Sequence, residues 1–264
     1  MFDLQRCTRT NLRTMLMTWA WAFIVCQPCQ AQPTFWGSVT GRDVLSESEA
    51  LSSPLAELGD AVEVVAAPRP FSLEGLSQAR LVAPLRSASM ALALEARGSA
   101  ALMRIAPSAR LRWVPAEGYV MGLASGLEWM SIRGFDDMIA ARLDVHAGMT
   151  MAEWTVAAGI DAMIEMGAAR GPVFRMGLAA VLDSHTITAE LRLPWNRPAA
   201  LRIAARARLA AGTDVRAGLC SDPVSVDCAL RMNVSPGTHL LIDVRSVNPL
   251  GLCTTLTLAF AVPW

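Results

Sequence analysis

The stretch Met138-Ile-Ala-Ala-Arg-Leu-Asp-Val-His-Ala-Gly-Met-Thr-Met151 decides the fold, because its apolar and polar side chains alternate. From Ile139 onward every second residue is apolar, and the positions between them include Arg142, Asp144 and His146. Successive side chains of a β-strand point to opposite faces, so this stretch predicts a strand with one apolar and one charged face. A soluble sandwich packs such apolar faces together, whereas a membrane barrel turns them outward to lipid.

The alternation recurs in segment after segment from about residue 79 to the end of the chain. In residues 201–209 one face carries Leu201, Ile203, Ala205, Ala207 and Leu209, and the other carries Arg202, Arg206 and Arg208. Residues 103–113, 120–132 and 154–166 alternate less clearly, because Gly or Ala occupies many positions of the polar face. Short turns rich in Gly, Pro, Asn and Asp separate the segments, as in a β-meander.

Helices are the alternative, since alanine-rich stretches such as residues 199–211 suit a helix by propensity. Residues 186–193 and 252–262, however, are rich in Thr, Ile, Val and Leu and fit a period of two. We therefore predict an all-β fold, a transmembrane antiparallel β-barrel of about 12–14 strands with short turns. Residues 61–67 are a candidate for one further strand.

The N-terminus has the features of a cleaved signal peptide, residues 1–31. Three arginines precede the apolar run 15–26, and Cys29-Gln30-Ala31 offers a small-x-small cleavage site before Gln32. A retained anchor fits less well because the run is shorter than a membrane span. Acylation of Cys26, as in a lipoprotein, fits less well because the residues before it are not small.

The remaining chain divides into an N-terminal lead-in or plug segment, residues 32–77, and the barrel, residues 78–264. The first segment lacks periodicity and contains four prolines. It includes a candidate helix at residues 45–58, which Pro54 interrupts. We expect this segment to precede the barrel in the periplasm or to lie in the barrel mouth.

The composition argues against nucleic acid as a partner, and it leaves undecided whether two of the cysteines form a disulfide. The chain has 264 residues and no lysine, and its 23 arginines balance 23 acidic residues, which argues against nucleic acid. Three cysteines follow the leader, and Cys220 and Cys228 flank a short turn where an oxidising compartment would allow a bridge. Strict alternation places these two cysteines on opposite faces, so a bridge requires a bulge.

Residues of the polar face are expected to line the lumen. The candidates are Arg142, Asp144, His146, Arg202, Arg206, Arg208, Asp243 and Arg245. Two interpretations stay open: a solvated, ion-paired lumen that stiffens the barrel, or an arginine-lined passage that prefers anions. The sequence has no nucleophile motif, metal-ligand spacing or phosphate loop, so it predicts no enzyme, no catalytic residue, no cofactor and no metal.

The chain ends with Leu258, Phe260, Val262 and Trp264 on one face of the last segment. This resembles the C-terminal signature of bacterial outer-membrane barrels, an aromatic residue preceded by hydrophobic residues at every second position. The resemblance implies location in the outer membrane, with outer-membrane lipid and the barrel-assembly machinery as partners. The aromatic girdle would have to come from Trp113, Trp129, Trp154, Trp195 and Trp264, because there is one tyrosine.

The region from Pro68-Arg-Pro-Phe-Ser-Leu-Glu-Gly-Leu76 onward also resembles small outer-membrane proteins of Bacteroidota-type bacteria. These are distantly like fatty-acid-transporter-like and type IX secretion accessory barrels, and no functional residue is transferred from them. The first functional hypothesis is a passive, weakly anion-preferring channel. The alternatives are a structural or accessory barrel bound to other envelope proteins, and a soluble periplasmic β-sandwich.

Overall fold

The structure is a computed structural model that describes residues 38–263, apart from positions 46, 51–52, 58, 60, 68–76, 86–88, 100–101, 135, 166–167, 223 and 248–250. The predicted signal peptide, the motif at residues 68–76 and Trp264 lie outside the described residues. The side chains of Arg245 and Val262 also lie outside them, although both residues belong to strands.

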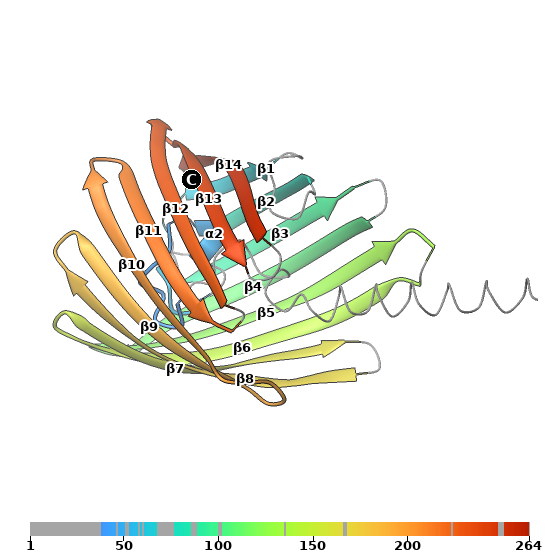
Figure 1. The fold of residues 1–264 in the computed structure, drawn as a ribbon, viewed down its shortest axis with the longest axis horizontal. Coiled ribbons are helices and arrows are strands. Elements are labelled where there is room, and N and C mark those ends of the chain that lie inside the picture. Colours follow the sequence, from blue (N-terminus) through green and yellow to red (C-terminus); the bar gives the residue numbers. More distant parts are fainter. Residues whose placement is uncertain are drawn as a thin grey trace, which may run out of the picture.

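Fourteen antiparallel strands form a closed barrel (Figure 1). In chain order they are β1 (Ala61–Ala67), β2 (Ser77–Leu85), β3 (Met90–Gly98), β4 (Leu102–Ala116), β5 (Tyr119–Ile132), β6 (Met138–Met151), β7 (Trp154–Glu165), β8 (Ala168–Leu182), β9 (His185–Pro194), β10 (Ala200–Ala210), β11 (Thr213–Ser221), β12 (Val224–Ser235), β13 (Thr238–Val247) and β14 (Gly251–Pro263). Each strand pairs with its neighbours in sequence, and β14 returns to pair with β1. The predicted all-β barrel is confirmed, and the chain forms one closed sheet in place of the two packed sheets of a sandwich.

The outer surface of the barrel is apolar and its interior is charged. In β6, Leu143 and Val145 are 47% and 43% exposed, whereas Asp144 and His146 between them are 1% exposed. The same alternation places large hydrophobic side chains outward on the other strands. An apolar outside around a polar inside is the arrangement of an outer-membrane-type β-barrel, because lipid replaces the core that a soluble sandwich would need.

Aromatic side chains lie near both rims of this apolar surface. We call the rim where β1 begins and β14 ends the terminal rim, and the opposite one the far rim. Trp113, Tyr119 and Trp154 are exposed where β4 ends and where β5 and β7 begin, which is the terminal rim. Trp129 and Trp195 lie near the far rim, where β5 and β9 end. These positions match the interfacial belts of a membrane-spanning barrel.

The turns at the terminal rim are short. The connections after β4, β6, β8, β10 and β12 each have two residues between the strands. Gly118 and Gly237 have φ values of 76° and 74°, a conformation that a two-residue hairpin turn requires and that glycine adopts without strain. Short hairpins hold each strand in register with the next, so the inward residues of neighbouring strands meet in the lumen.

The candidate strand at residues 61–67 is present and belongs to the barrel wall. Ala61–Ala67 forms β1, so the barrel begins before residue 78, where the boundary between lead-in and barrel was expected. Its residues pair with β14 from Ala61–Pro263 to Ala66–Leu258 and with β2 on the other side. Without β1, the strands β2 and β14 would be the edges of an open sheet, so this short strand closes the barrel.

The described residues between Ser38 and Glu57 lie inside the barrel and are called the plug from here on. Among the described residues of the expected helix at 45–58, only one turn is helical, α2 (Glu47–Ala50), drawn in blue within the barrel (Figure 1). Pro54 and contacts with the wall favour an irregular path for the rest. Among the described residues, no helix is long and apolar enough to cross a bilayer.

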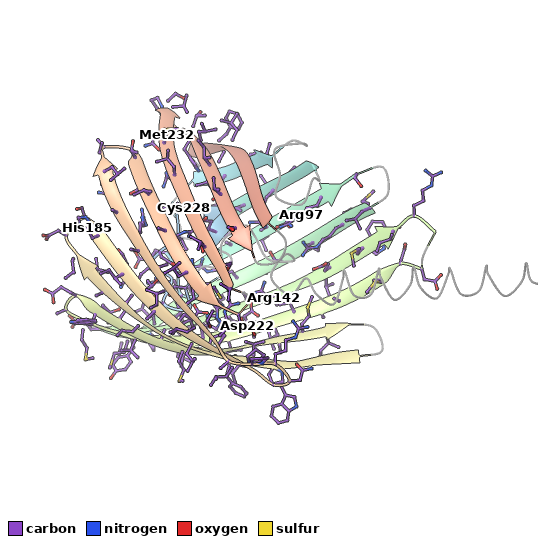
Figure 2. The ribbon with its side chains drawn as sticks, viewed as in Figure 1. Arg97, Arg142, His185, Asp222, Cys228 and Met232 are labelled. Atoms are coloured by element: carbon purple, nitrogen blue, oxygen red, sulfur yellow. The ribbon has the colours of Figure 1, made fainter. Side chains whose placement is uncertain are left out.

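Cys220 and Cys228 are free thiols on opposite faces of the wall. Cys220 is buried opposite Ser225, whereas Cys228 is exposed on β12 (Figure 2) and pairs with Ala217. The strict alternation therefore holds here, with no bulge between β11 and β12 that would bring the sulfurs together.

Candidate functional site: the plugged lumen

Carboxylates pair with arginines on the wall of the lumen between β6 and β9. His146 Nε2 lies 2.7 Å from Asp161 Oδ1, and Arg175 Nη1 lies 3.2 Å from Asp161 Oδ2. Arg175 also donates from Nε to Glu190 Oε1 at 2.7 Å, and Arg192 donates to the same oxygen at 2.8 Å. All of these residues project inward from neighbouring strands, so the network ties four strands together across the polar face.

Most of the predicted lumen residues face inward, as the alternation required. Arg142 pairs with buried Asp144 at 2.5 Å, and His146 joins the network just described. Asp243 is fully buried. Arg208 differs, since its side chain is 66% exposed near the terminal rim, where the wall ends. The side chain of Arg245 lies outside the described residues.

Two buried ion pairs connect the plug to the wall. Arg202 Nη1 donates to Asp43 Oδ2 at 3.0 Å, and both side chains are almost fully buried. Arg216 Nη2 and Nη1 donate to the two oxygens of Glu49 at 2.9 Å and 3.3 Å. The same Glu49 carboxylate accepts the backbone N–H of Leu45 at 2.5 Å, which closes the turn that leads into α2. Wall arginines therefore hold the plug through its acidic residues.

Arginines also satisfy the backbone of the plug. Five wall arginines donate to plug carbonyls: Arg110 to Ala50 and Pro54, Arg112 to Leu55, Arg206 to Val44, Arg216 to Asp43, and Arg231 to Leu45. An irregular segment has few internal partners for its carbonyls, and leaving them buried without hydrogen bonds would be costly. The wall supplies these bonds because one guanidinium carries five N–H donors in a fixed fork.

Glycines of the wall provide the space that the plug occupies. A Cβ added to Gly122 of β5 would overlap Pro54, and one added to Gly177 of β8 would overlap the side chain of Val39. Val39 is fully buried there, and its N–H donates to Glu190 at 2.8 Å. The wall therefore leaves space for the plug at two places, one near each end of the plug.

The plug spans the lumen, since its contacts reach β4, β5 and every strand from β8 to β12. Its apolar contacts are small: Leu45 packs on Ala229 and Leu241, and Val39 and Leu55 pack near Ala157. The lumen is therefore crossed by a segment that is held mainly through polar contacts.

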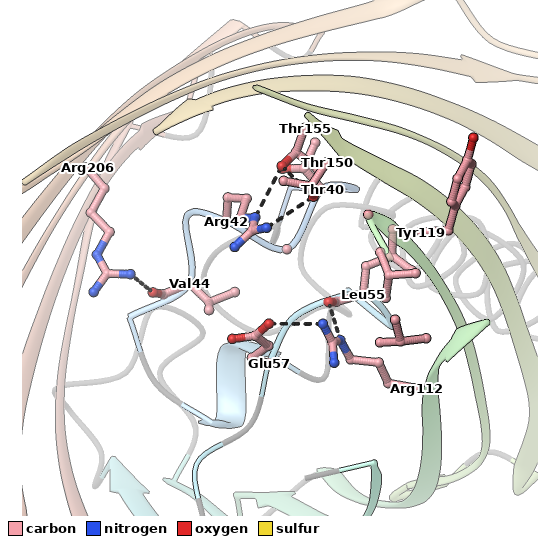
Figure 3. Close-up of a pocket in the computed structure, with 14 residues that line it drawn as sticks. Thr40, Arg42, Val44, Leu55, Glu57, Arg112, Tyr119, Thr150, Thr155 and Arg206 are labelled. Carbon is pink, nitrogen blue, oxygen red and sulfur yellow. Dashed lines mark hydrogen bonds and ion pairs between the residues drawn. The ribbon is translucent and has the colours of Figure 1, made fainter. Parts of the chain in front are cut away.

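A cavity of about 350 Å³ remains between the plug and the wall (Figure 3). Gly118 and Tyr119 are among its lining residues, which places it at the terminal rim. Its charged residues are Arg42 and Glu57 of the plug, Arg112 of β4 and Arg206 of β10. The cavity combines an excess of guanidinium groups with hydroxyl and aliphatic side chains.

Comparisons with known proteins agree with the barrel architecture only in outline. No protein-family model matches the chain, and no curated protein matches it. Among solved structures, the KdgM porin in complex with disordered oligogalacturonate is 11% identical with a TM-score of 0.45, and covers 76% of this chain and 98% of that one. A mutant of the Rh. blastica porin is 9% identical with a TM-score of 0.46 and the same coverage. At these scores the likeness carries no argument, so the fold assignment rests on the closed strand order.

Sequence reasoning missed the residues that hold the plug. Arg110, Arg112, Arg216 and Arg231 were not among the lumen candidates, although the alternation places them on the polar face. One sequence feature could have identified these contacts: an arginine-rich barrel face preceded by a segment that carries two acidic residues, Asp43 and Glu49. The weak alternation of β5, caused in part by Gly122, was a second signal, because a small residue on the inner face leaves room for another segment.

Proposed function

We propose that this protein is an outer-membrane channel for small solutes, closed at rest by its own plug and weakly selective for anions. The observation that carries the proposal is a charged lumen occupied by a segment that is bound mainly through hydrogen bonds and ion pairs. Such contacts can be exchanged for water when the plug leaves, whereas a lumen packed with apolar side chains could not be hydrated at similar cost.

The proposal includes location, partners and the absence of catalysis. The apolar surface between two aromatic rims supports an outer-membrane site, with outer-membrane lipid around the barrel and the assembly machinery as a transient partner. His146 contacts Asp161, but no hydroxyl or thiol nucleophile is bonded to it among the described residues. The Bacteroidota-type relationship stays part of this proposal, and its motif lies outside the described residues.

The anion preference has a different basis from the one that the sequence predicted. Arg202 is paired with Asp43, and Arg206 and Arg208 lie 3.4 Å and 3.8 Å from the same oxygen of Asp214, so each of the three arginines expected to form an anion wall has an acidic partner. The exposed Arg208 lies at the terminal rim. Any selectivity should therefore depend on arginines whose partners among the described residues are neutral, such as Arg110, which donates to the backbone carbonyls of Pro54 and Ala50.

A structural or accessory barrel is the second candidate. It is favoured by the burial of the two ion pairs that hold the plug, since ion pairs withdrawn from water are costly to break. In that case the plug would be a permanent part of the interior, and the barrel would act through partners in the envelope.

Planar-bilayer recording of the full mature chain separates the two candidates. We expect rare openings from the unaltered protein and frequent openings when Asp43→Asn and Glu49→Gln are combined, because both buried charge pairs with the plug are then lost. A potassium chloride gradient would give the sign of the selectivity from the reversal potential. A silent bilayer from both proteins, with folded barrels shown by heat-modifiable gel mobility, would contradict the channel and support the accessory role.

A further inference from the structure

The cavity at the terminal rim has more positive than negative charge on its lining. Three of its four charged lining residues are arginines, and they come from the plug, β4 and β10 (Figure 3). Figure 3 shows Arg42, Arg112 and Arg206 approaching the same space from different sides. A recess surrounded by guanidinium groups attracts anions, because their charge is only weakly screened away from bulk water.

Two of these arginines already have a carboxylate partner. Arg112 Nη2 lies 3.0 Å from Glu57 Oε1, and Arg206 Nη2 lies 3.4 Å from Asp214 Oδ1. Each also donates to a plug carbonyl, Arg112 to Leu55 at 3.1 Å and Arg206 to Val44 at 2.7 Å. Their charges are therefore largely balanced within the protein, although each guanidinium keeps further N–H groups.

Arg42 is the exception, because its partners among the described residues are neutral. Its Nε donates to Thr155 Oγ1 at 3.3 Å and its Nη2 to Thr150 Oγ1 at 3.2 Å. The two hydroxyls lie 3.1 Å apart and hold the guanidinium from one side. Two fixed hydroxyls orient the group without neutralising it, so within the described part of the chain one positive charge of the cavity lacks a counter-charge.

The rest of the lining is suited to an organic ligand. Val44, Leu55, Val114 and Val120 supply aliphatic surface, and Thr40, Thr150 and Thr155 supply hydroxyls. The volume of about 350 Å³ falls at the lower end of the range for small-molecule sites. An apolar body can lie on the valines and Leu55 while its charged group faces Arg42.

We propose that this cavity binds a small organic carboxylate, with the carboxylate on Arg42 and the apolar body against Val44, Leu55 and Val120. A single uncompensated guanidinium matches a monoanion better than a dianion, and its fork geometry matches the two oxygens of a carboxylate. The inference goes beyond the proposed channel, because the site would bind ligand whether or not the barrel conducts.

Calorimetric titration of the full mature protein in detergent, with a detergent blank, tests the site without any conductance measurement. The probes are benzoate, its neutral isostere benzamide, and inorganic phosphate. We expect one saturable benzoate site per chain and affinities at least tenfold weaker for benzamide and for phosphate. Equal affinities for benzoate and benzamide, or no saturation with benzoate, would overturn the proposal. Phosphate binding as tight as that of benzoate would overturn the assignment of the site to a monocarboxylate.

Substitutions then locate the site. Arg42→Met should weaken benzoate binding at least tenfold, since it removes the charged partner of the carboxylate. Arg208→Met is the matched control, because it removes the same charge from an exposed side chain outside the cavity lining and should change affinity by less than about twofold. Equal effects of the two changes would place the anion elsewhere. The benzoate–benzamide comparison on the unaltered protein decides the question if Arg42→Met does not fold.

Discussion

Replacing Glu49 by Gln should release the plug without disturbing the barrel. Glu49 is 1% exposed, and its two oxygens accept three hydrogen bonds, two from Arg216 and one from the N–H of Leu45. Removing one charge from a buried pair costs about 3–5 kcal/mol, because the partner charge is left in the interior. Gln keeps one acceptor oxygen and the shape of Glu, so we expect the lower limit, about 3 kcal/mol.

That energy corresponds to a large change in the fraction of open molecules. At about 1.4 kcal/mol per factor of ten, a loss of about 3 kcal/mol raises the open population roughly a hundredfold. Ser53 reports on this opening, since it is fully buried in the plug and its hydroxyl lies 3.4 Å from the carbonyl of Val39. In a protein whose other mature cysteines are alanine, Ser53→Cys should react with a polar maleimide only when the plug leaves. The labelling rate should then rise about a hundredfold in Glu49→Gln.

Glu57→Gln is the matched control for this experiment. Glu57 is also a plug carboxylate paired with a wall arginine, Arg112, but its side chain is 69% exposed. Exposed pairs contribute about 1 kcal/mol or less, so labelling should change by no more than about fivefold. Equal labelling rates in Glu49→Gln and Glu57→Gln, with both barrels folded, would refute the claim that buried charge holds the plug.

A double substitution separates charge from packing. If Glu49 and Arg216 both become Met, both charges of this pair are removed together, and replacing a buried pair with apolar residues is often neutral in stability. The labelling rate should therefore fall by more than tenfold relative to Glu49→Gln. A rate as high as that of the single substitution would show that the hydrogen bonds of Glu49, and not the pairing of charges, decide the stability of the plug.

Three further results are expected. Gly177→Val should raise channel opening in bilayers while the barrel stays folded, because the added side chain would overlap Val39; unchanged opening would contradict the fit of plug to wall. Leu143→Arg, on the outer face, should reduce the stability of the membrane-inserted barrel by about 2–4 kcal/mol in denaturant titrations in lipid, and an unchanged stability would argue against lipid contact. Replacing Phe260 and Trp264 by Ser should lower the amount of protein in outer-membrane fractions and raise periplasmic fragments; normal abundance would remove the role proposed for the C-terminus.

The strands could be predicted because a period of two is a strong local pattern. The predicted bounds of β6, Met138–Met151, agree with the structure, and the inward placement of Arg142, Asp144 and His146 follows from the same pattern. The position of a residue along the barrel axis is harder to predict. Arg208 has the same parity as Arg202 and is nevertheless exposed, since it lies near the end of β10.

Partners distant in sequence could not be predicted. Alternation assigns a side chain to a face, but it does not say which residue of the lead-in that face will meet. Arg202 and Asp43 are 159 residues apart, and their contact depends on how the plug is threaded through the lumen. The lead-in was expected before the barrel or in its mouth. Its irregular backbone is stabilised by hydrogen bonds with wall arginines, and local propensity does not encode such distant partners.

The junction between the plug and β1 limits where a released plug can go. Glu57 is the last residue of the plug, and β1 begins at Ala61. An extended chain spans at most about 3.5 Å per residue, so this end of the plug can move only about 14 Å from the start of the wall. The released segment is therefore a tethered ligand of its own barrel, with an effective concentration of order millimolar at the terminal rim. It would re-enter as a first-order event whose rate is independent of protein concentration, and a free peptide of the same sequence would need a comparable concentration to compete with it.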